Sequence, residues 1–381
     1  MPLFLFFAPA HAAHELAADA TKETRIGNRV IRTNKPTRNL LFLRGPSSPS
    51  LILLRTTSNT CEGMRLLNVL IRCLSAITTV AVAAGQYSGG DTSGCGKTHL
   101  FQGVTQTRII RSSGKYRAYG VHLPSGYDKN KRYPTILGFH GSSSIGLFFE
   151  LDTRLSSSKY PADSIVVYPN GIGGAWAGAS YSETTVTEDL QFVWDILTDL
   201  RRYFCVDSAR IYATGMSIGG GFVDTIACNA TVGGEFAAFA PASGSFYTDN
   251  DANHESCKPA RVPTPIIEIH GGADTSVAYN GGVGEGGINP AIPAWLDRWA
   301  ERNQCDKPNS QSDLYGGDVH HLSWTCKGVA GALQHYKTDD QKHCWASTEI
   351  NFSQLAAGDK PTHIEASAIF REFFKSFTRP A

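Results

Sequence analysis

The segment Tyr212–Phe222 reads YATGMSIGGGF and places Ser217 at the centre of a Gly-x-Ser-x-Gly pattern. In this pattern the serine occupies a sharp turn from a strand into a helix, which leaves room only for glycine on either side. The turn holds the hydroxyl above the sheet, beside the partly positive N-terminus of the helix. The flanking residues predict this context, with a strand at Ala209–Thr214 and a helix at Gly220–Cys228. Ser217 is therefore the predicted nucleophile, and a glycine-serine loop without chemistry is the alternative.

A serine hydroxyl becomes a good nucleophile only when a base takes its proton and a third group orients that base. In folds built around this turn, the chain order is serine, then acid, then histidine. Asp274 follows the predicted strand Thr264–His270, on a loop at the carboxyl edge of the sheet, where catalytic groups collect. We therefore predict Asp274 as the acid, with Asp249 and Asp251 as the alternatives.

The base is expected among the seven histidines that follow Ser217. His343 lies in DDQKHCWAS, a loop between the last predicted strand and the last predicted helix, which is where the base belongs. The other six precede the acid, belong to strands or open the final helix: His254, His270, His320, His321, His335 and His363. His343 is therefore the predicted base.

Two backbone N–H groups are needed to stabilise the oxyanion that forms when an ester is attacked. Ile218 is predicted to supply one, because it directly follows the nucleophile. The loop GFHGSSS after an early strand is predicted to supply the other, from Ser142 or alternatively from Gly141. His140 in the same loop is expected to brace it rather than to take part in chemistry.

Aromatic side chains are candidates for the substrate pocket. They are Tyr168, Trp176, Tyr181, Trp194, Tyr247 and Trp345. Trp345 follows the predicted base closely and is predicted to form one wall of an acyl pocket, with plain packing as the alternative. Tyr168 and Trp176 are the further predicted substrate contacts.

The rest of the chain alternates between apolar runs and segments of helical spacing. Further strands are predicted at Gly103–Arg111, Tyr116–Leu123, Tyr133–His140, Ser164–Tyr168, Phe236–Pro241, Leu322–Cys326 and Ala332–Thr338. Further helices are predicted at Val186–Phe204, Ala291–Asn303 and Thr362–Phe377. The first two strands are expected to pair antiparallel. Strands that alternate with helices predict an α/β fold with a mainly parallel central sheet flanked by helices, in one domain at residues 85–381.

The composition excludes some classes of function. The 381 residues are 41% hydrophobic and 18% charged, with a net charge of +1 and no long run of one sign. This balance is typical of a globular protein and lacks the basic footprint of a nucleic-acid-binding protein. No apolar run is long and clean enough to predict a transmembrane helix. No Cys-x-x-Cys pair is present, which argues against a zinc ribbon or a redox motif.

An internal segment has the form of a secretory signal. Residues 64–84 read MRLLNVLIRCLSAITTVAVAA, with a positively charged start, an apolar stretch and a small-x-small cleavage site. We therefore expect translation to start at Met64 and residues 1–63 to be a non-native or disordered extension. A true targeting segment, or a signal at MPLFLFFAPAHAA, is the alternative. The chain is accordingly expected to be secreted and extracellular.

The cysteines support export. Seven of the nine follow the signal: Cys95, Cys205, Cys228, Cys257, Cys305, Cys326 and Cys344. Scattered cysteines in an exported chain usually form disulfides, and an odd number leaves at least one unpaired or paired with another chain. A disulfide at Cys344 would fix the loop of His343. Asn229-Ala-Thr and Asn351-Phe-Ser match the glycosylation pattern.

Taken together, these motifs resemble one family across nearly the whole segment from Cys95 to the last helix. The matching pieces are GCGKT, FHG, YPNG, CVDSARIYATGMSIGGG, IHGGADTSVAY and HCW. The chain is similar to secreted fungal feruloyl esterases, which are related to bacterial polyhydroxybutyrate-depolymerase-like esterases. The resemblance implies an α/β-hydrolase fold and a triad of Ser217, Asp274 and His343. It also implies cleavage of the ester that links ferulate or p-coumarate to arabinose on plant xylan or pectin.

Several residues depart from the family pattern. Trp345 is followed by Ala346-Ser347 where relatives often have Pro-Ser, Ile218 stands where an aromatic residue is common, and HGSSSIG is an unusual oxyanion segment. These departures leave the acyl preference open, with an acetylxylan esterase or a polyester depolymerase as the alternatives. A non-catalytic carbohydrate-binding relative and a peptidase of the same fold are more distant ones. The chemistry needs no metal or cofactor, and we expect a monomer.

Overall fold

The computed structural model describes residues 93–250, 256–306 and 310–380, which belong to a compact unit spanning Ala83–Ala381. The predicted extension at 1–63, the predicted signal at 64–84 and the alternative acid Asp251 lie outside the described residues. Within them, no helix is long and apolar enough to cross a membrane.

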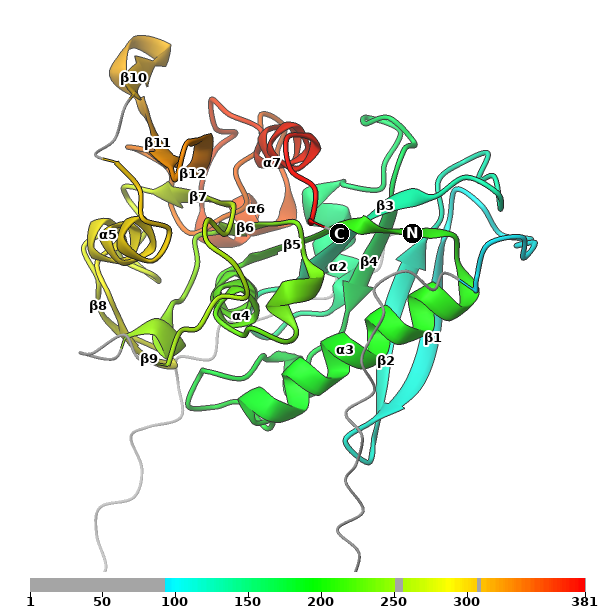
Figure 1. The fold of residues 1–381 in the computed structure, drawn as a ribbon. Coiled ribbons are helices and arrows are strands. Elements are labelled where there is room, and N and C mark those ends of the chain that lie inside the picture. Colours follow the sequence, from blue (N-terminus) through cyan, green and yellow to red (C-terminus); the bar gives the residue numbers. More distant parts are fainter. Residues whose placement is uncertain (1–92, 251–255, 307–309, 381) are drawn as a thin grey trace, which may run out of the picture. The chain divides into compact units, whose positions relative to one another are not determined.

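A large twisted sheet forms the centre of the fold (Figure 1). Its strands are β1 (Thr105–Ser112), β2 (Lys115–His122), β3 (Tyr133–Phe139), β4 (Ile165–Pro169), β5 (Val206–Met216), β6 (Ala238–Ala242), β7 (Ile266–Gly271), β10 (Ser310–Leu314), β11 (Val319–Cys326) and β12 (Val329–Thr338). In the described part of the chain they are ordered β1-β2-β4-β3-β5-β6-β7-β12-β11-β10. The central strands from β4 to β12 are parallel, and antiparallel strands complete both edges.

Helices cover both faces of this sheet. They are α2 (Gly146–Thr153), α3 (Val186–Tyr203), α4 (Ile218–Ala227), α5 (Ile292–Arg302), α6 (Phe352–Ala357) and α7 (Ala366–Lys375). Short 3-10 helices occupy Ile172–Gly174, Gly233–Glu235, Tyr247–Asp249 and Tyr315–Gly317. A separate small hairpin is formed by β8 (Gly282–Gly284) and β9 (Gly287–Asn289).

The alternation of side chains along each strand divides the core into two layers. On one face, Leu137 and neighbouring strand residues pack with Phe192 of α3, Phe222 of α4 and the tryptophans of α5. On the other face, Ile136 belongs to a layer that includes Phe149 of α2 and the phenylalanines of α7. Adjacent residues of one strand therefore enter opposite cores, which is why the central strands are apolar throughout.

The structure confirms the α/β fold class and every predicted strand and helix, including the first antiparallel pair. Besides the short 3-10 helices, it adds two α-helices and three strands that the sequence analysis did not predict: α2, α6, β8, β9 and β10. The last of these extends the sheet beyond β11, and the two helices lie beside the functional residues described below.

Three disulfides join Cys95 to Cys205, Cys228 to Cys257 and Cys305 to Cys326. Cys344 is free and buried, with its sulfur 3.5 Å from a carboxylate oxygen of Asp359. This confirms the expectation that at least one of the seven cysteines is unpaired or paired with another chain, and the loop of His343 is not held by a disulfide at Cys344.

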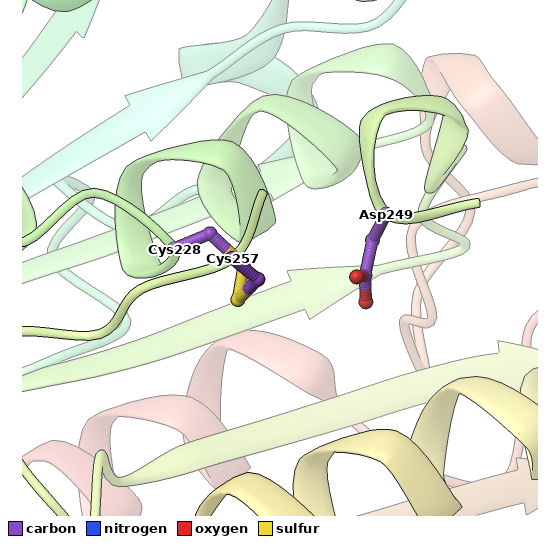
Figure 2. Close-up of side chains that lie close together, drawn as sticks. All are labelled: Cys228, Asp249 and Cys257. Atoms are coloured by element: carbon purple, nitrogen blue, oxygen red, sulfur yellow. A yellow bond between two sulfur atoms is a disulfide. The ribbon is translucent and has the colours of Figure 1, made fainter. Parts of the chain in front are cut away.

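Figure 2 shows that Asp249 lies close to the Cys228–Cys257 pair, a grouping that could suggest a metal site. Both sulfurs are consumed by the disulfide, and the Asp249 carboxylate lies 2.8 Å from the guanidinium of Arg302. These three residues therefore offer no thiolate ligands.

A buried ion pair attaches α3 to the sheet. Arg117 on β2 lies 2.9 Å from Asp189 in the first turn of α3, and neither side chain is more than 2% exposed. The guanidinium also stacks over Phe192, 3.9 Å from the ring centroid. The other Asp189 oxygen accepts hydrogen bonds from Ala177 N–H and the Thr184 hydroxyl.

We expect Arg117→Leu to lower the free energy of unfolding by about 3–5 kcal/mol, because it leaves the Asp189 carboxylate buried without its cation. The matched control is Lys115→Ala, which breaks an exposed pair with Glu188 between the same strand and the same helix. It should change stability little. Urea denaturation of both variants checks this, and equal effects would contradict it.

Candidate active site

The predicted nucleophile stands in a strained turn. β5 ends at Met216, α4 begins at Ile218, and Ser217 between them has φ 58° and ψ −126°. This conformation is energetically unfavourable for a residue with a side chain, and it persists only when the surrounding structure enforces it. Here Ser217 N–H donates to the Ala242 carbonyl of β6 at 3.0 Å.

The glycines of the motif are required by space. A Cβ on Gly215 would lie 2.5 Å from the carbonyl oxygen of Gly219, and one on Gly219 would lie 2.2 Å from that of Phe139. Neither position has room for a side chain. The close approach of α4 to the ends of β3 and β5 thus explains the spacing of the motif.

The predicted acid and base are hydrogen-bonded to each other. His343 Nδ1 donates to Asp274 Oδ2 at 2.7 Å, and Asp274 Oδ1 accepts the N–H groups of Ser276 and Val277 at 2.8 Å each. Asp274 is only 4% exposed. An ionised carboxylate can only accept, so this hydrogen bond places the imidazole proton on Nδ1 and leaves Nε2 without one, as the predicted role of a base requires.

One cleft of about 860 Å³ collects the predicted groups. Ser217, Ile218, Ser142 and His343 all line it, and Asp274 lies behind His343. The loop of Ser142 reaches the nucleophile directly, since a Cβ on Gly141 would lie 3.4 Å from that of Ser217. Residues from four separate parts of the chain therefore meet at the carboxyl edge of the sheet.

His140 braces the oxyanion loop. Its Nδ1–H donates to the Gly141 carbonyl at 2.7 Å, and its Nε2 accepts the Gly171 N–H at 3.0 Å. Burial lowers the pKa of this imidazole to about 4, although the hydrogen bond to Gly141 opposes the shift. His140 is therefore neutral at physiological pH, and both ring nitrogens are used to hold backbone.

The structure corrects the prediction of which aromatic residues contact the substrate. Trp345, Tyr168 and Trp176 are at most 1% exposed, and none of them lines the cleft. Trp345 packs edge-on against Phe149 and Phe370. Trp345 lies close to His343 in sequence, but its side chain turns into the core between α2 and α7.

Other aromatic residues line the cleft instead. Tyr181 and Tyr247 were among the candidates, whereas Phe148 and Phe352 were missed because α2 and α6 were not predicted. The adjacent phenylalanines in GLFFELDT were the available signal in the sequence for α2. In the structure, Phe149 is buried in the core and Phe148, 53% exposed, faces the cleft.

The signal for α6 was present but assigned to glycosylation. Asn351 is the N-cap of α6 and forms a capping box with Gln354. Its amide donates to the Trp345 carbonyl at 2.9 Å, and the residue is 5% exposed. A glycan at Asn351 is incompatible with this arrangement, whereas glycosylation at Asn229 stays a prediction.

The sequence comparisons identify the family, although no family model matches the chain. The chain is 31% identical over 250 residues to a probable feruloyl esterase C of Aspergillus clavatus, covering 63% of this chain and 76% of that protein. It is 30% identical over 263 residues to feruloyl esterase D of Neurospora crassa, covering 65% and 78%. The chain belongs to the feruloyl esterase family.

A solved structure supports the fold of this feruloyl esterase family member. An acetyl xylan esterase from Aspergillus awamori superposes with a TM-score of 0.52 at 15% identity, covering 71% of this chain and 99% of that one. At this identity the likeness concerns the fold alone, and it confirms the predicted α/β-hydrolase architecture.

We expect Gly219→Ala to lower the free energy of unfolding by about 1–3 kcal/mol or more and to displace Ser217, because its Cβ must push the β3 carbonyls away. Gly234→Ala is the control, since its Cβ would meet only the Ala260 side chain at 3.2 Å. Thermal unfolding and reactivity of Ser217 toward a phosphonate probe measure both effects. A Gly219→Ala protein with normal stability and labelling would contradict the steric explanation.

Proposed function

We propose that the chain is a secreted serine carboxylic-ester hydrolase that releases ferulate or p-coumarate from feruloylated plant cell-wall polysaccharide. The observation that carries the proposal is the Asp274–His343 hydrogen bond of 2.7 Å beside a cleft that also contains Ser217 in its strained turn. Membership of the feruloyl esterase family supports the same reaction.

In the first half-reaction, His343 Nε2 takes the proton of Ser217 Oγ as this oxygen attacks the ester carbonyl. Asp274 keeps the imidazole in the reactive tautomer and stabilises the imidazolium that forms. The N–H groups of Ser142 and Ile218 stabilise the oxyanion, and the N-terminus of α4 adds a favourable field.

Collapse of the tetrahedral intermediate breaks the bond to the sugar oxygen. His343 returns the proton to that oxygen, so the arabinosyl group leaves as an alcohol and the acyl group remains on Ser217. In the second half-reaction, His343 activates a water that attacks the acyl-enzyme, and Ser217 regains its proton as the carboxylic acid departs.

The dimensions and walls of the cleft favour an aromatic acyl group over acetyl. A volume of about 860 Å³ is far larger than acetyl needs, and Phe148 and Phe352 line one side of it. The phenol groups of Tyr181 and Tyr247 line it as well, and they can donate hydrogen bonds to a hydroxylated ring or a sugar. We propose that the feruloyl ring packs on the two phenylalanines.

Secretion is supported by the three disulfides, which are typical of extracellular proteins. A polysaccharide substrate of the plant cell wall requires an extracellular enzyme. We propose that the chain acts there as a monomer, without a metal or cofactor in the reaction.

We expect Ser217→Ala to lower kcat for methyl ferulate and feruloylated arabinoxylan by about four orders of magnitude or more, because no acyl-enzyme can form. Ser144→Ala makes the same change elsewhere in the cleft lining and should keep nearly full activity. Ferulate release is measured by chromatography. Retained turnover in Ser217→Ala would exclude the mechanism.

We expect Phe352→Ala to raise KM for methyl ferulate by roughly tenfold, because a loss of about 1.4 kcal/mol of aromatic packing corresponds to a tenfold weaker affinity. Activity on a short acetyl ester should change little. Leu355→Ala is the matched control, because this residue is on the same helix and is similarly exposed but does not line the cleft. Equal losses on both esters, or equal effects of the two variants, would refute the aromatic subsite.

A further inference from the structure

A second cluster of ionisable groups lies behind the triad, buried in the sheet. Glu268 of β7 is 0% exposed and stands opposite His335 of β12 in the parallel register. His335 Nδ1 lies 2.8 Å from Glu268 Oε2, and His270 Nδ1 lies 2.8 Å from Glu268 Oε1. His270 and His335 are at most 1% exposed. The mechanism proposed above uses none of these three residues.

The partners of His270 determine where its protons lie. Nδ1 faces the Glu268 carboxylate, and Nε2 lies 2.8 Å from the Val277 carbonyl. A carbonyl oxygen can only accept, and so can an ionised carboxylate, so both ring nitrogens must donate. His270 is therefore an imidazolium when Glu268 is ionised. His335 needs no charge, because the Tyr279 hydroxyl lies 3.0 Å from its Nε2 and can donate to it.

Electrostatics favour this arrangement of charge. Burial alone lowers the pKa of His270, but Glu268, Asp274 and the Val277 carbonyl together raise it above the ordinary value. Burial likewise raises the pKa of Glu268, but His270 and His335 bring it below the ordinary value. The pair is thus an internally neutralised, hydrogen-bonded ion pair, the form in which buried charges are tolerated.

His270 also contacts the acid of the triad. Its Nε2 lies 3.6 Å from Asp274 Oδ2, which is the oxygen that receives His343 Nδ1. The Val277 carbonyl that His270 holds belongs to the residue whose N–H donates to Asp274 Oδ1. One imidazolium therefore acts on both carboxylate oxygens, by its charge on one and through the backbone on the other.

We propose that His270 is a positioning residue of the active site, a buried cation that holds the Asp274 loop and offsets part of the Asp274 charge felt by His343. The inference rests on the proposed function. Charges alternate from Glu268 to His270 to Asp274, and His343 becomes positive only during the reaction. The cation reduces the net negative charge that faces His343, so its loss is expected to move the acid limb of the activity profile to higher pH.

Further titratable groups face this chain of residues in the described part of the protein. Tyr279 packs edge-on to His270, and Lys337 lies over the Tyr279 ring. Asp152 and Glu285 line the cleft that contains His343. Asp339 acts on Tyr279, and the thiol of Cys344, next to His343, interacts with Asp359, Asp152 and Asp274. Substitution of His270 leaves all of these groups in place, so a change in the pH profile would report the lost cation.

The test compares the pH dependence of kcat/KM for methyl ferulate in the wild type, His270→Gln and His335→Gln. Loss of the cation should raise the apparent pKa of the acid limb by about one pH unit, which is about tenfold in rate at pH values below the limb. His335→Gln removes an equally buried partner of Glu268, at the other carboxylate oxygen, and should leave the limb in place. A lower plateau with an unmoved limb in His270→Gln would overturn the proposal.

A second measurement detects the charge of His270 directly and does not depend on activity. Imidazole nitrogen NMR at pH 7 should show His270 with both nitrogens protonated, and Glu268→Gln should abolish that signal. His320 also has both ring nitrogens beside carboxylates, Asp313 at 2.7 Å and Asp339 at 3.1 Å, so its signal is identified by its loss in His320→Gln. A neutral His270 at pH 7 would overturn the proposal whatever the substrate. Conversely, a chain without esterase activity that keeps the imidazolium signal would refute the proposed function and leave the ion pair in place.

Discussion

The arrangement of the active site depends on one backbone turn, in which β5 gives way to α4 at Ser217 with a positive φ. The turn is possible only because Gly215 and Gly219 let α4 approach the ends of β3 and β5 within contact distance of bare backbone. That approach places the N–H of Ile218 beside the nucleophile and brings the Ser142 loop over it. The parallel sheet contributes the rest, because its carboxyl edge also ends β7, from which the loop of Asp274 extends.

The acid–base pair is held by layers of hydrogen bonds that begin at the cleft and end in the core. His343 is oriented by Asp274, Asp274 by the backbone of Ser276 and Val277, and that backbone by His270. Each residue in this series forms hydrogen bonds with the polar groups of the residue before it. Such a chain of contacts holds the buried carboxylate of Asp274 in one orientation toward His343, on which the proposed general base catalysis depends.

The residues proposed to carry the chemistry were predictable because their constraints are local or follow chain order. The spacing of glycines around Ser217 reflects steric contact within a few residues, and the order of serine, acid and histidine follows from the sheet.

The walls of the cleft were not predictable in the same way. Phe148 and Phe352 are on helices of eight and six residues, whose formation depends on tertiary contacts such as the hydrogen bond from Ser353 N–H to Asp152. The pairing of Glu268 with His335 depends on the register of two strands far apart in sequence. Trp345 shows the same limit, because its position beside His343 does not determine which way its side chain turns.

The central claim, that Ser217 carries the acyl group of an aromatic ester, is tested most directly by mass spectrometry of the acyl-enzyme. The protein is mixed with a ferulate ester for milliseconds, quenched in acid and digested. We predict a single feruloyl adduct on the peptide that contains Ser217, which disappears as turnover ends. An adduct on another residue, or ferulate release with no adduct at any mixing time, would contradict the account.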